Sequence, residues 1–430
     1  MIKNKTNSDV NKKVSKKLVV TLSSIFAISP FAIDSYLPAL PRIAEKMQVD
    51  ISMLSVTVSL YILGLGFGQL IGGPLSDKHG RLPIMILGLG IFASSSLLLT
   101  TSTNISQLWA WRLVEAIGGG IAIVGVPAII RDNANGREAA KLFSLIALIM
   151  MIAPSIAPSI GNLILSFQSW QWIFYFIAIF ACFAMLMAIK FIPHQSKKAK
   201  LKYEAEHGEG APKPKAIKFI DILKDKYAIG YLIAQGFAFS VMISFVTNSA
   251  MIYMGEFKVN ADTFSLLFAI NIFSLIVINR LNNFLLNRFE PSVLLRFFLT
   301  LQFIGTILLV TNFMFENKNL PFAVFAFALT IGANGGIMAN SSACFLSFFG
   351  KSAGTASATL GFFQCITGAA VSAFAAFISM GHPFPVVLIM LTSSSIALSA
   401  VIYSNKKMQK LAKQKAEEKM TNINSRVEDN

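Results

Sequence analysis

The chain alternates between long apolar stretches and short polar ones. Apolar runs of about 20 residues, long enough to cross a bilayer as helices, recur twelve times along the sequence. The predicted spans are 18–40, 54–75, 83–101, 106–130, 142–166, 170–192, 227–255, 263–281, 293–313, 320–345, 353–379 and 384–403. This pattern predicts an all-α polytopic membrane protein with twelve transmembrane helices.

One long polar segment divides these spans into two sets of six. Residues 193–226 are rich in charged residues of both signs and contain Gly and Pro, which is typical of a linker. Because transporters are commonly built from structural repeats, two six-helix bundles are expected. The predicted organisation is an N-terminal tail (1–17), an N-terminal six-helix bundle (18–192), the linker, a C-terminal six-helix bundle (227–403) and a C-terminal tail (404–430).

Composition supports the membrane assignment. Hydrophobic residues make up 54% of the chain and charged residues only 13%, with a mean hydropathy of +0.63. A soluble globular protein carries about 25% charged residues. A soluble domain with a single membrane anchor is therefore excluded.

The basic residues predict the orientation of the chain. With a cytoplasmic N-terminus, 32 of the 37 lysines and arginines fall in cytoplasmic segments and 4 on the opposite side. Because cytoplasmic loops carry an excess of Lys and Arg, both termini are predicted to be cytoplasmic. The excess of Lys and Arg in cytoplasmic segments then explains the net charge of +16. The predicted partner is the lipid bilayer, and no nucleic-acid partner is predicted.

Several chemistries find no support in the sequence. The three cysteines lie in apolar segments without a CxxC pair, and the four histidines are scattered, so no metal site is predicted. No nucleophile–base pair marks a catalytic site, and no GxxxxGK[ST] motif for ATP is present. We expect no catalytic residue, no enzyme activity and no cofactor. A channel or a membrane enzyme is a less favoured alternative.

Three ionisable residues remain inside the predicted spans: Asp34 in the first, and Arg112 and Glu115 in the fourth. A charge at bilayer depth costs roughly 2.5–3.5 kcal/mol on insertion scales, and such residues mark functional sites. From the helical rise, Asp34 and Arg112 each lie about 9 Å below the outer surface and Glu115 about 14 Å. Arg112 and Glu115 are three residues apart, so they share one face of their helix.

These three residues allow two interpretations. They could form a buried ion pair that only fixes helix packing. However, two acids share one base, and burial disfavours the charged form of a carboxyl group whereas a neighbouring guanidinium favours it. One acid could therefore exchange a proton near neutral pH. The hypothesis is that Asp34 carries the proton, Glu115 is a second site and Arg112 is their switchable partner.

The loop after the second span carries a recognisable motif. The string GQLIGGPLSDKHGRLPIM (68–85) combines glycines that allow close helix contact with Asp77 and Arg81 flanking a turn at Gly80. From Gly73 through Arg81 it resembles the signature of the major facilitator superfamily, G-x-L-[AS]-D-[RK]-x-G-[RK]-[RK]. Leu82 stands where a second basic residue is common. On this resemblance the loop is a conformational gate.

Two later segments are similar to the same family. In RLVEAIGGGIAIVGVPAIIRD (112–132), Arg131 matches the arginine that pairs with the loop aspartate in the family. MIAPSIAPSIGNLI (151–164) resembles the antiporter motif of the fifth span, with Pro154, Pro158 and Gly161 kept and alanines in place of two glycines. The resemblance gives these residues a role in conformational gating.

AIDSYLPALP (32–41) and AGTASATLGFFQ (353–364) narrow the resemblance to the bicyclomycin/chloramphenicol-resistance (Bcr/CflA) branch of twelve-span drug:proton antiporters. That branch more often has glutamine at the position of Glu115. The resemblance implies the major facilitator fold and alternating access around a cavity lined mainly by spans 1, 4, 7 and 10. On that analogy the substrate-cavity residues are Tyr36, Asp34, Arg112, Glu115, Gln235, Phe239, Asn248, Asn334 and Asn340. For each neutral residue of the second half, helix-to-helix hydrogen bonding is an equal alternative.

The function predicted from sequence is proton-coupled export of small amphipathic drugs or metabolites across the bacterial inner membrane. The proton gradient would be the energy source, with a small-molecule substrate, protons and the lipid bilayer as partners, and the chain is expected to act as a monomer. An alternative within the same class is a dedicated exporter of an endogenous siderophore or metabolite. A polycarboxylate would require more positive charge than Arg112 alone supplies.

Overall fold

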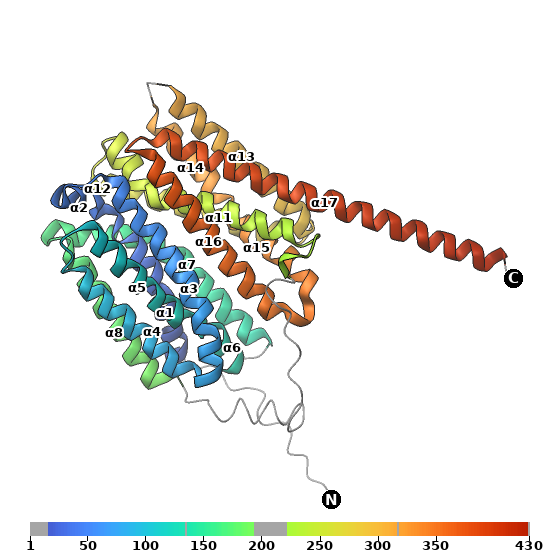
Figure 1. Ribbon diagram of the computed structural model, residues 1–430, viewed down its shortest axis with the longest axis horizontal. Coiled ribbons are helices and arrows are strands. Elements are labelled where there is room, and N and C mark those ends of the chain that lie inside the picture. Colours follow the sequence, from blue (N-terminus) through green and yellow to red (C-terminus); the bar gives the residue numbers. More distant parts are fainter. Residues whose placement is uncertain (1–15, 134–135, 193–221, 316–317, 429–430) are drawn as a thin grey trace, which may run out of the picture. The chain divides into compact units, whose positions relative to one another are not determined.

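The computed structural model describes residues 16–133, 136–192, 222–315 and 318–428 (Figure 1). Within these ranges every regular element is a helix. The chain separates into two compact units, one of residues 1–49 and 60–213 and the other of residues 50–59 and 214–430. The predicted linker falls mostly outside the described residues, as does most of the N-terminal tail.

The first unit is a bundle in which α1 packs against α5, α7 and α8, and α4 packs against α5 and α8. Residues of α3 from 60 onward belong to this unit. Its helices are α1 (Lys16–Asp34), η1 (Leu37–Ala39), α2 (Leu40–Met47), α3 (Ile51–His79), α4 (Arg81–Leu99), α5 (Ile105–Val124), α6 (Val126–Asn133), α7 (Gly136–Phe167) and α8 (Gln171–Phe191).

The second unit is built around α11, which packs against α15, α16 and α17, while α13 packs against α14, α15 and α17. Its helices are α11 (Ile229–Ala250), the π-helix η2 (Met251–Glu256), α12 (Ala261–Leu285), α13 (Pro291–Met314), α14 (Leu320–Gly332), α15 (Asn334–Leu346), η3 (Ser347–Ser352), α16 (Ala353–Ser379) and α17 (Pro383–Glu428).

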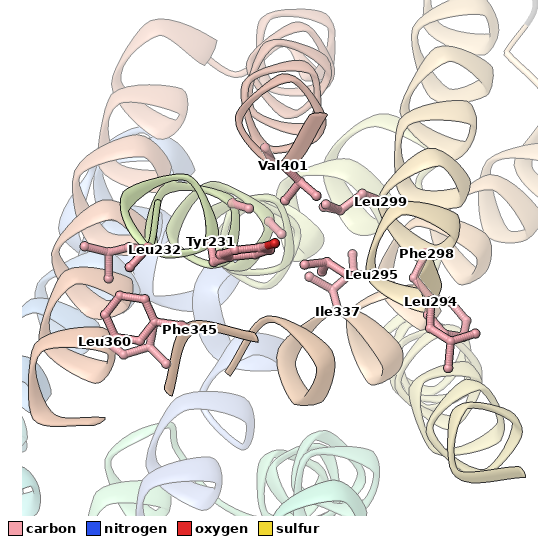
Figure 2. Close-up of a cluster of buried hydrophobic side chains, with 14 of the residues drawn as sticks. Tyr231, Leu232, Leu294, Leu295, Phe298, Leu299, Ile337, Phe345, Leu360 and Val401 are labelled. Atoms are coloured by element: carbon pink, nitrogen blue, oxygen red, sulfur yellow. The ribbon is translucent and has the colours of Figure 1, made fainter. Parts of the chain in front are cut away.

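Side chains from five helices of the second unit meet in one apolar core (Figure 2). Tyr231 and Leu232 come from α11, and Leu295 and Phe298 come from α13. Ile337 of α15, Leu360 of α16 and Val401 of α17 also belong to the cluster. This core holds α11 against α15 and α16, and those three helices carry the polar groups considered below.

Ten helical segments of the described chain are long and apolar enough to cross a membrane, and each coincides with one predicted span. The predicted span 106–130 corresponds to α5 and α6 and is not among the ten. The predicted span 142–166 lies within α7, where the apolar segment of described residues is Ile152–Phe167. The protein is therefore a multi-pass membrane protein.

Two of the predicted spans contain an interruption in the helix. The span 106–130 is interrupted at Gly125, and the span 320–345 is interrupted at Ala333. The second break lies among three glycines, which have low helix propensity. A Cβ added to Gly335 would collide with the Leu275 carbonyl oxygen of α12, and one added to Gly336 with the ring of Phe298 in α13. These two glycines let α15 approach both neighbours closely.

Glycines also hold α5 tightly between α3 and α4. A Cβ added to Gly68 of α3 would collide with the Ile117 carbonyl oxygen of α5. On the other side, a Cβ at Gly88 of α4 would lie 2.7 Å from the Gly118 carbonyl oxygen of α5. Small residues are what allow membrane helices to approach this closely. The helix that carries Arg112 and Glu115 is therefore fixed backbone to backbone on both sides.

The turn between α3 and α4 requires its glycine. Gly80 is the residue between the two helices and has φ +94° and ψ 154°. This backbone region is essentially restricted to glycine, because a Cβ is strained there. The predicted turn at Gly80 is confirmed.

We predict that Gly80→Ala lowers the free energy of unfolding by about 1–3 kcal/mol because of this backbone strain. Gly90→Ala is the matched control, since a Cβ at Gly90 meets nothing within 4 Å and alanine favours the helix. The measurement is denaturant unfolding of the purified protein in detergent. Equal stability of the two variants would contradict the prediction.

Candidate functional site

Among the Asp, Glu, Lys and Arg side chains of the described residues, only three are buried: Asp34, Arg112 and Glu115. Asp34 is 5% exposed, and Arg112 and Glu115 are fully buried. All three belong to the first unit. The three charges that sequence places inside the spans are thus the buried charges of the described chain.

Arg112 and Glu115 form a closed ion pair on α5. Arg112 Nη1 lies 2.7 Å from Glu115 Oε2, and the Ser96 hydroxyl of α4 donates a hydrogen bond to Glu115 Oε1 at 2.6 Å. Both oxygens of the carboxylate therefore accept a hydrogen bond. A buried ion pair offsets its desolvation cost only when its remaining groups are also hydrogen-bonded, and Ser96 supplies that bond for Glu115.

Aromatic rings surround the Arg112 guanidinium. Arg112 Cζ lies 4.6 Å from the ring centre of Tyr36, 5.2 Å from that of Tyr61 and 5.4 Å from that of Phe174. These rings come from the end of α1, from α3 and from α8. A cation near the face of an aromatic ring is attracted by its quadrupole, most strongly when it is desolvated. The rings thereby stabilise the Arg112 charge where water is excluded.

The same guanidinium closes the end of α1. The helix ends at Asp34, so the carbonyl oxygens of its last turn lack their usual partners. Arg112 Nη2 donates a hydrogen bond to the Ala32 carbonyl oxygen at 2.9 Å, and the Ser35 amide and hydroxyl both donate to that of Phe31. An unsatisfied backbone group in lipid would cost several kcal/mol. Arg112 therefore serves both as the partner of Glu115 and as a cap for α1.

Asp34 stands apart from this pair. No hydrogen bond or ion pair to its carboxyl group is present within the described residues. It is also the last residue of α1, where the helix dipole places partial negative charge and opposes a carboxylate. The Arg112 side chain contacts α1 at Ala32, two residues before Asp34. Its ion pair, however, is with Glu115 and not with Asp34.

The residues assigned to gating are distributed along the first unit. Gly161 of α7 touches the turn that follows Asp34, because a Cβ there would overlap the Ser35 carbonyl oxygen. Pro154 and Pro158 lie inside the same helix, and Arg81 begins α4 after the Gly80 turn. A Cβ added to Gly73 would be in ordinary contact with Val124, at 3.9 Å. The side chains of Asp77 and Arg131 lie outside the described part of the structure.

The residues proposed from the second half form two kinds of contact. Gln235 and Asn340 join helices: Gln235 bonds to Gln364 of α16 and Ser342 of α15, and Asn340 Nδ2 donates to Asn282 Oδ1 of α12 at 2.6 Å. Phe239 packs against Gly368 of α16. These contacts match the helix-to-helix alternative.

Each of the two remaining asparagines bonds to the carbonyl oxygen four residues before it. Asn248 Nδ2 donates to the Ser244 carbonyl oxygen at 2.9 Å, and Asn334 Nδ2 lies 3.5 Å from that of Thr330. Asn248 is five helical turns from Gly230, and Gly230 packs against α17. Asn248 therefore lies on the α17 face of α11, whereas Gln235 faces α15 and α16.

Sequence reasoning did not find Ser96, Tyr61 or Phe174. Ser96 lies in a run of three serines within an apolar span, and its spacing alone does not distinguish it from its neighbours. Tyr61 could have been suspected as a tyrosine within an apolar run; its hydroxyl donates to Ser29 Oγ of α1 at 3.2 Å. No group of described His, Cys, Asp and Glu residues could hold a metal ion.

We predict that Arg112→Met lowers the free energy of unfolding by about 3–5 kcal/mol, because it leaves Glu115 as an uncompensated buried charge. Adding Glu115→Leu removes that charge and should restore part of the loss. Denaturant unfolding of the single and double variants measures the coupling.

The surface ion pair of Lys318 with Glu256 provides the control. Lys318→Ala should cost only about 0–1 kcal/mol, because this pair is partly exposed to solvent. Strictly additive effects of Arg112→Met and Glu115→Leu would show that the two side chains are not coupled.

Comparison with known proteins agrees with this fold. The model of the Major Facilitator Superfamily matches residues 22–373. A bicyclomycin resistance protein homolog of Haemophilus influenzae is 29% identical over 90% of this chain and 94% of its own. The multidrug resistance protein MdtL of Salmonella paratyphi B is 27% identical over 65% of this chain and 69% of its own.

A solved structure of the peptide transporter POT in complex with sulfate superposes with a TM-score of 0.72 at 14% identity, covering 92% of this chain and 94% of the other. That likeness shows the fold. The match to the bicyclomycin resistance homolog confirms the predicted resemblance to that branch. The chain belongs to the Major Facilitator Superfamily and is a multi-pass membrane transporter, not an enzyme.

Proposed function

We propose that the protein exports small amphipathic drugs or metabolites across the bacterial inner membrane in exchange for protons. In this proposal twelve helices cross the membrane as two six-helix bundles with both termini in the cytoplasm. The chain works as a monomer by alternating access, and the proton gradient supplies the energy. The names of the relatives, a bicyclomycin resistance protein homolog and a multidrug resistance protein, support drug-like substrates.

The observation that carries the proposal is the isolation of Asp34. It is buried and has no hydrogen-bond or ion-pair partner among the described residues. The charges of Arg112 and Glu115 compensate each other, so they do not offset a charge on Asp34. An uncompensated charge at bilayer depth is costly, and taking up a proton removes that cost. Asp34 is therefore the group suited to bind a proton on one side and release it on the other.

Glu115 is not suited to the same role. Its two oxygens accept hydrogen bonds from Arg112 and Ser96, and hydrogen bonds to the charged form favour that form. Protonation of Glu115 would also leave Arg112 as an uncompensated buried charge. We therefore assign Glu115 a structural role and propose that one proton, on Asp34, is exchanged in each cycle.

The contact of α7 with the end of α1 offers a route from protonation to movement. Gly161 lies directly against the Ser35 carbonyl oxygen, one residue after Asp34. A change of charge on Asp34 changes the electrostatic energy of this turn. Because no space separates Gly161 from the Ser35 carbonyl oxygen, a shift of the turn towards α7 would displace that helix. The two prolines of α7 remove backbone hydrogen bonds, which allows that helix to bend.

The two carboxylates can be separated experimentally. We predict that Asp34→Asn abolishes proton-driven uptake of substrate into inverted vesicles, because asparagine cannot exchange a proton. Glu115→Gln should retain substrate-driven proton movement, because it leaves Asp34 in place. It should also lower the free energy of unfolding, because Arg112 then lacks a compensating buried charge. Fluorescence of a pH-sensitive dye in the vesicles reports the proton flux.

Wild-type uptake should collapse with an uncoupler, which distinguishes proton exchange from passage through a channel. Both variants should unfold as cooperatively as the wild type, so that loss of transport is not loss of folding. Full transport by Asp34→Asn, or loss of proton coupling in Glu115→Gln with the fold intact, would overturn the assignment.

A further inference from the structure

Three polar side chains meet between α11, α15 and α16 in the second unit. The Ser342 hydroxyl of α15 donates to Gln235 Oε1 at 3.0 Å. Gln235 Nε2 of α11 donates in turn to Gln364 Oε1 of α16 at 2.7 Å. The three residues thus form a chain of hydrogen bonds that runs in one direction, from Ser342 through Gln235 to Gln364.

In this chain of hydrogen bonds the Gln364 amide presents its oxygen to Gln235. Gln235 is buried, 4% exposed, and both ends of its amide are engaged. Because its nitrogen faces Gln364, the oxygen of Gln364 faces Gln235. The Gln364 nitrogen consequently points away from the pair, and no bond of that nitrogen to a described residue is recorded. An amide nitrogen has two hydrogens to donate.

Gln364 is partly open, and two aromatic side chains lie along the same contact of α11 with α16. Gln364 is half-buried, so its nitrogen is not sealed inside the bundle. Next to it in α16, the Phe363 ring packs on Gly236 of α11, and one turn further the Phe239 ring packs on Gly368. Small-molecule sites are mostly apolar and aromatic, with a few fixed polar groups that orient the ligand. Gln364 is such a fixed polar group.

We propose that Gln364 Nε2 is a substrate-recognition donor, which binds a carbonyl, nitro or other acceptor oxygen on an uncharged part of the substrate. The proposal rests on the export function proposed above and adds a class of substrate to it. Gln364 selects among substrates by their acceptor groups, and Gln235 and Ser342 act as positioning residues that set the direction of its amide.

The test compares two probes on purified protein in detergent by calorimetry. Chloramphenicol is uncharged and carries amide and nitro oxygens, whereas tetraphenylphosphonium is a cation without a hydrogen-bonding atom. Gln364→Leu should raise the Kd for chloramphenicol about 3- to 10-fold, as expected for one lost hydrogen bond. The Kd for tetraphenylphosphonium should change by less than about twofold.

Two further variants separate recognition from helix packing. Ser342→Ala removes the first hydrogen bond without touching Gln364, and it should weaken chloramphenicol binding by less than Gln364→Leu does. Gln302→Leu is the matched control, because Gln302 of α13 is fully buried and donates to the Ala238 carbonyl oxygen at 3.3 Å. It should affect both probes equally through lost stability.

The outcomes distinguish this inference from the export function. An equal change for both probes in Gln364→Leu, or no change for either, overturns the donor assignment and leaves export standing. Tighter binding of chloramphenicol to Gln364→Leu would also overturn it. A wild-type protein that binds neither probe contradicts drug export itself, and the donor assignment with it.

Discussion

The structure of the first unit depends on the cost of placing charge and open backbone inside a membrane. Helix α1 ends at Asp34, within an apolar segment, and so leaves carbonyl oxygens without partners. Arg112 bonds to one of them and brings a positive charge, which Glu115 neutralises. Arg112 thus satisfies an open backbone group, and Glu115 compensates the charge that Arg112 brings into the membrane. Asp34 is the member whose charge no described residue offsets, and we therefore propose that it carries the proton.

Close helix packing is what makes this arrangement possible. Arg112 can reach α1, and Glu115 can reach α4, only because α5 lies in backbone contact with its neighbours at Gly68 and Gly88. The rings of Tyr36, Tyr61 and Phe174 fill the space around the guanidinium and exclude water. The contacts of Arg112 and Glu115 therefore depend on the close packing of α5 against its neighbours.

Much of the fold followed from the sequence because the length of an apolar run reports directly on membrane crossing. The same apolar runs predicted that Asp34, Arg112 and Glu115 would be buried. Helical periodicity predicted that Arg112 and Glu115, three residues apart, would lie on one face. The choice of Glu115 over Asp34 as partner of Arg112 was not predictable, since helical rise gives depth and not side-chain direction. Ser96 was equally hidden, because only the packing of α4 on α5 distinguishes it from the serines beside it.

We propose that a single carboxyl group, Asp34, exchanges the proton. The most direct measurement is the number of protons released when substrate binds to the purified protein in weakly buffered detergent solution, since linked binding of proton and substrate is reciprocal. If Asp34 alone exchanges a proton, about one proton is released per bound substrate at saturation. Release of about two protons, or of none at any pH at which substrate binds, would contradict it.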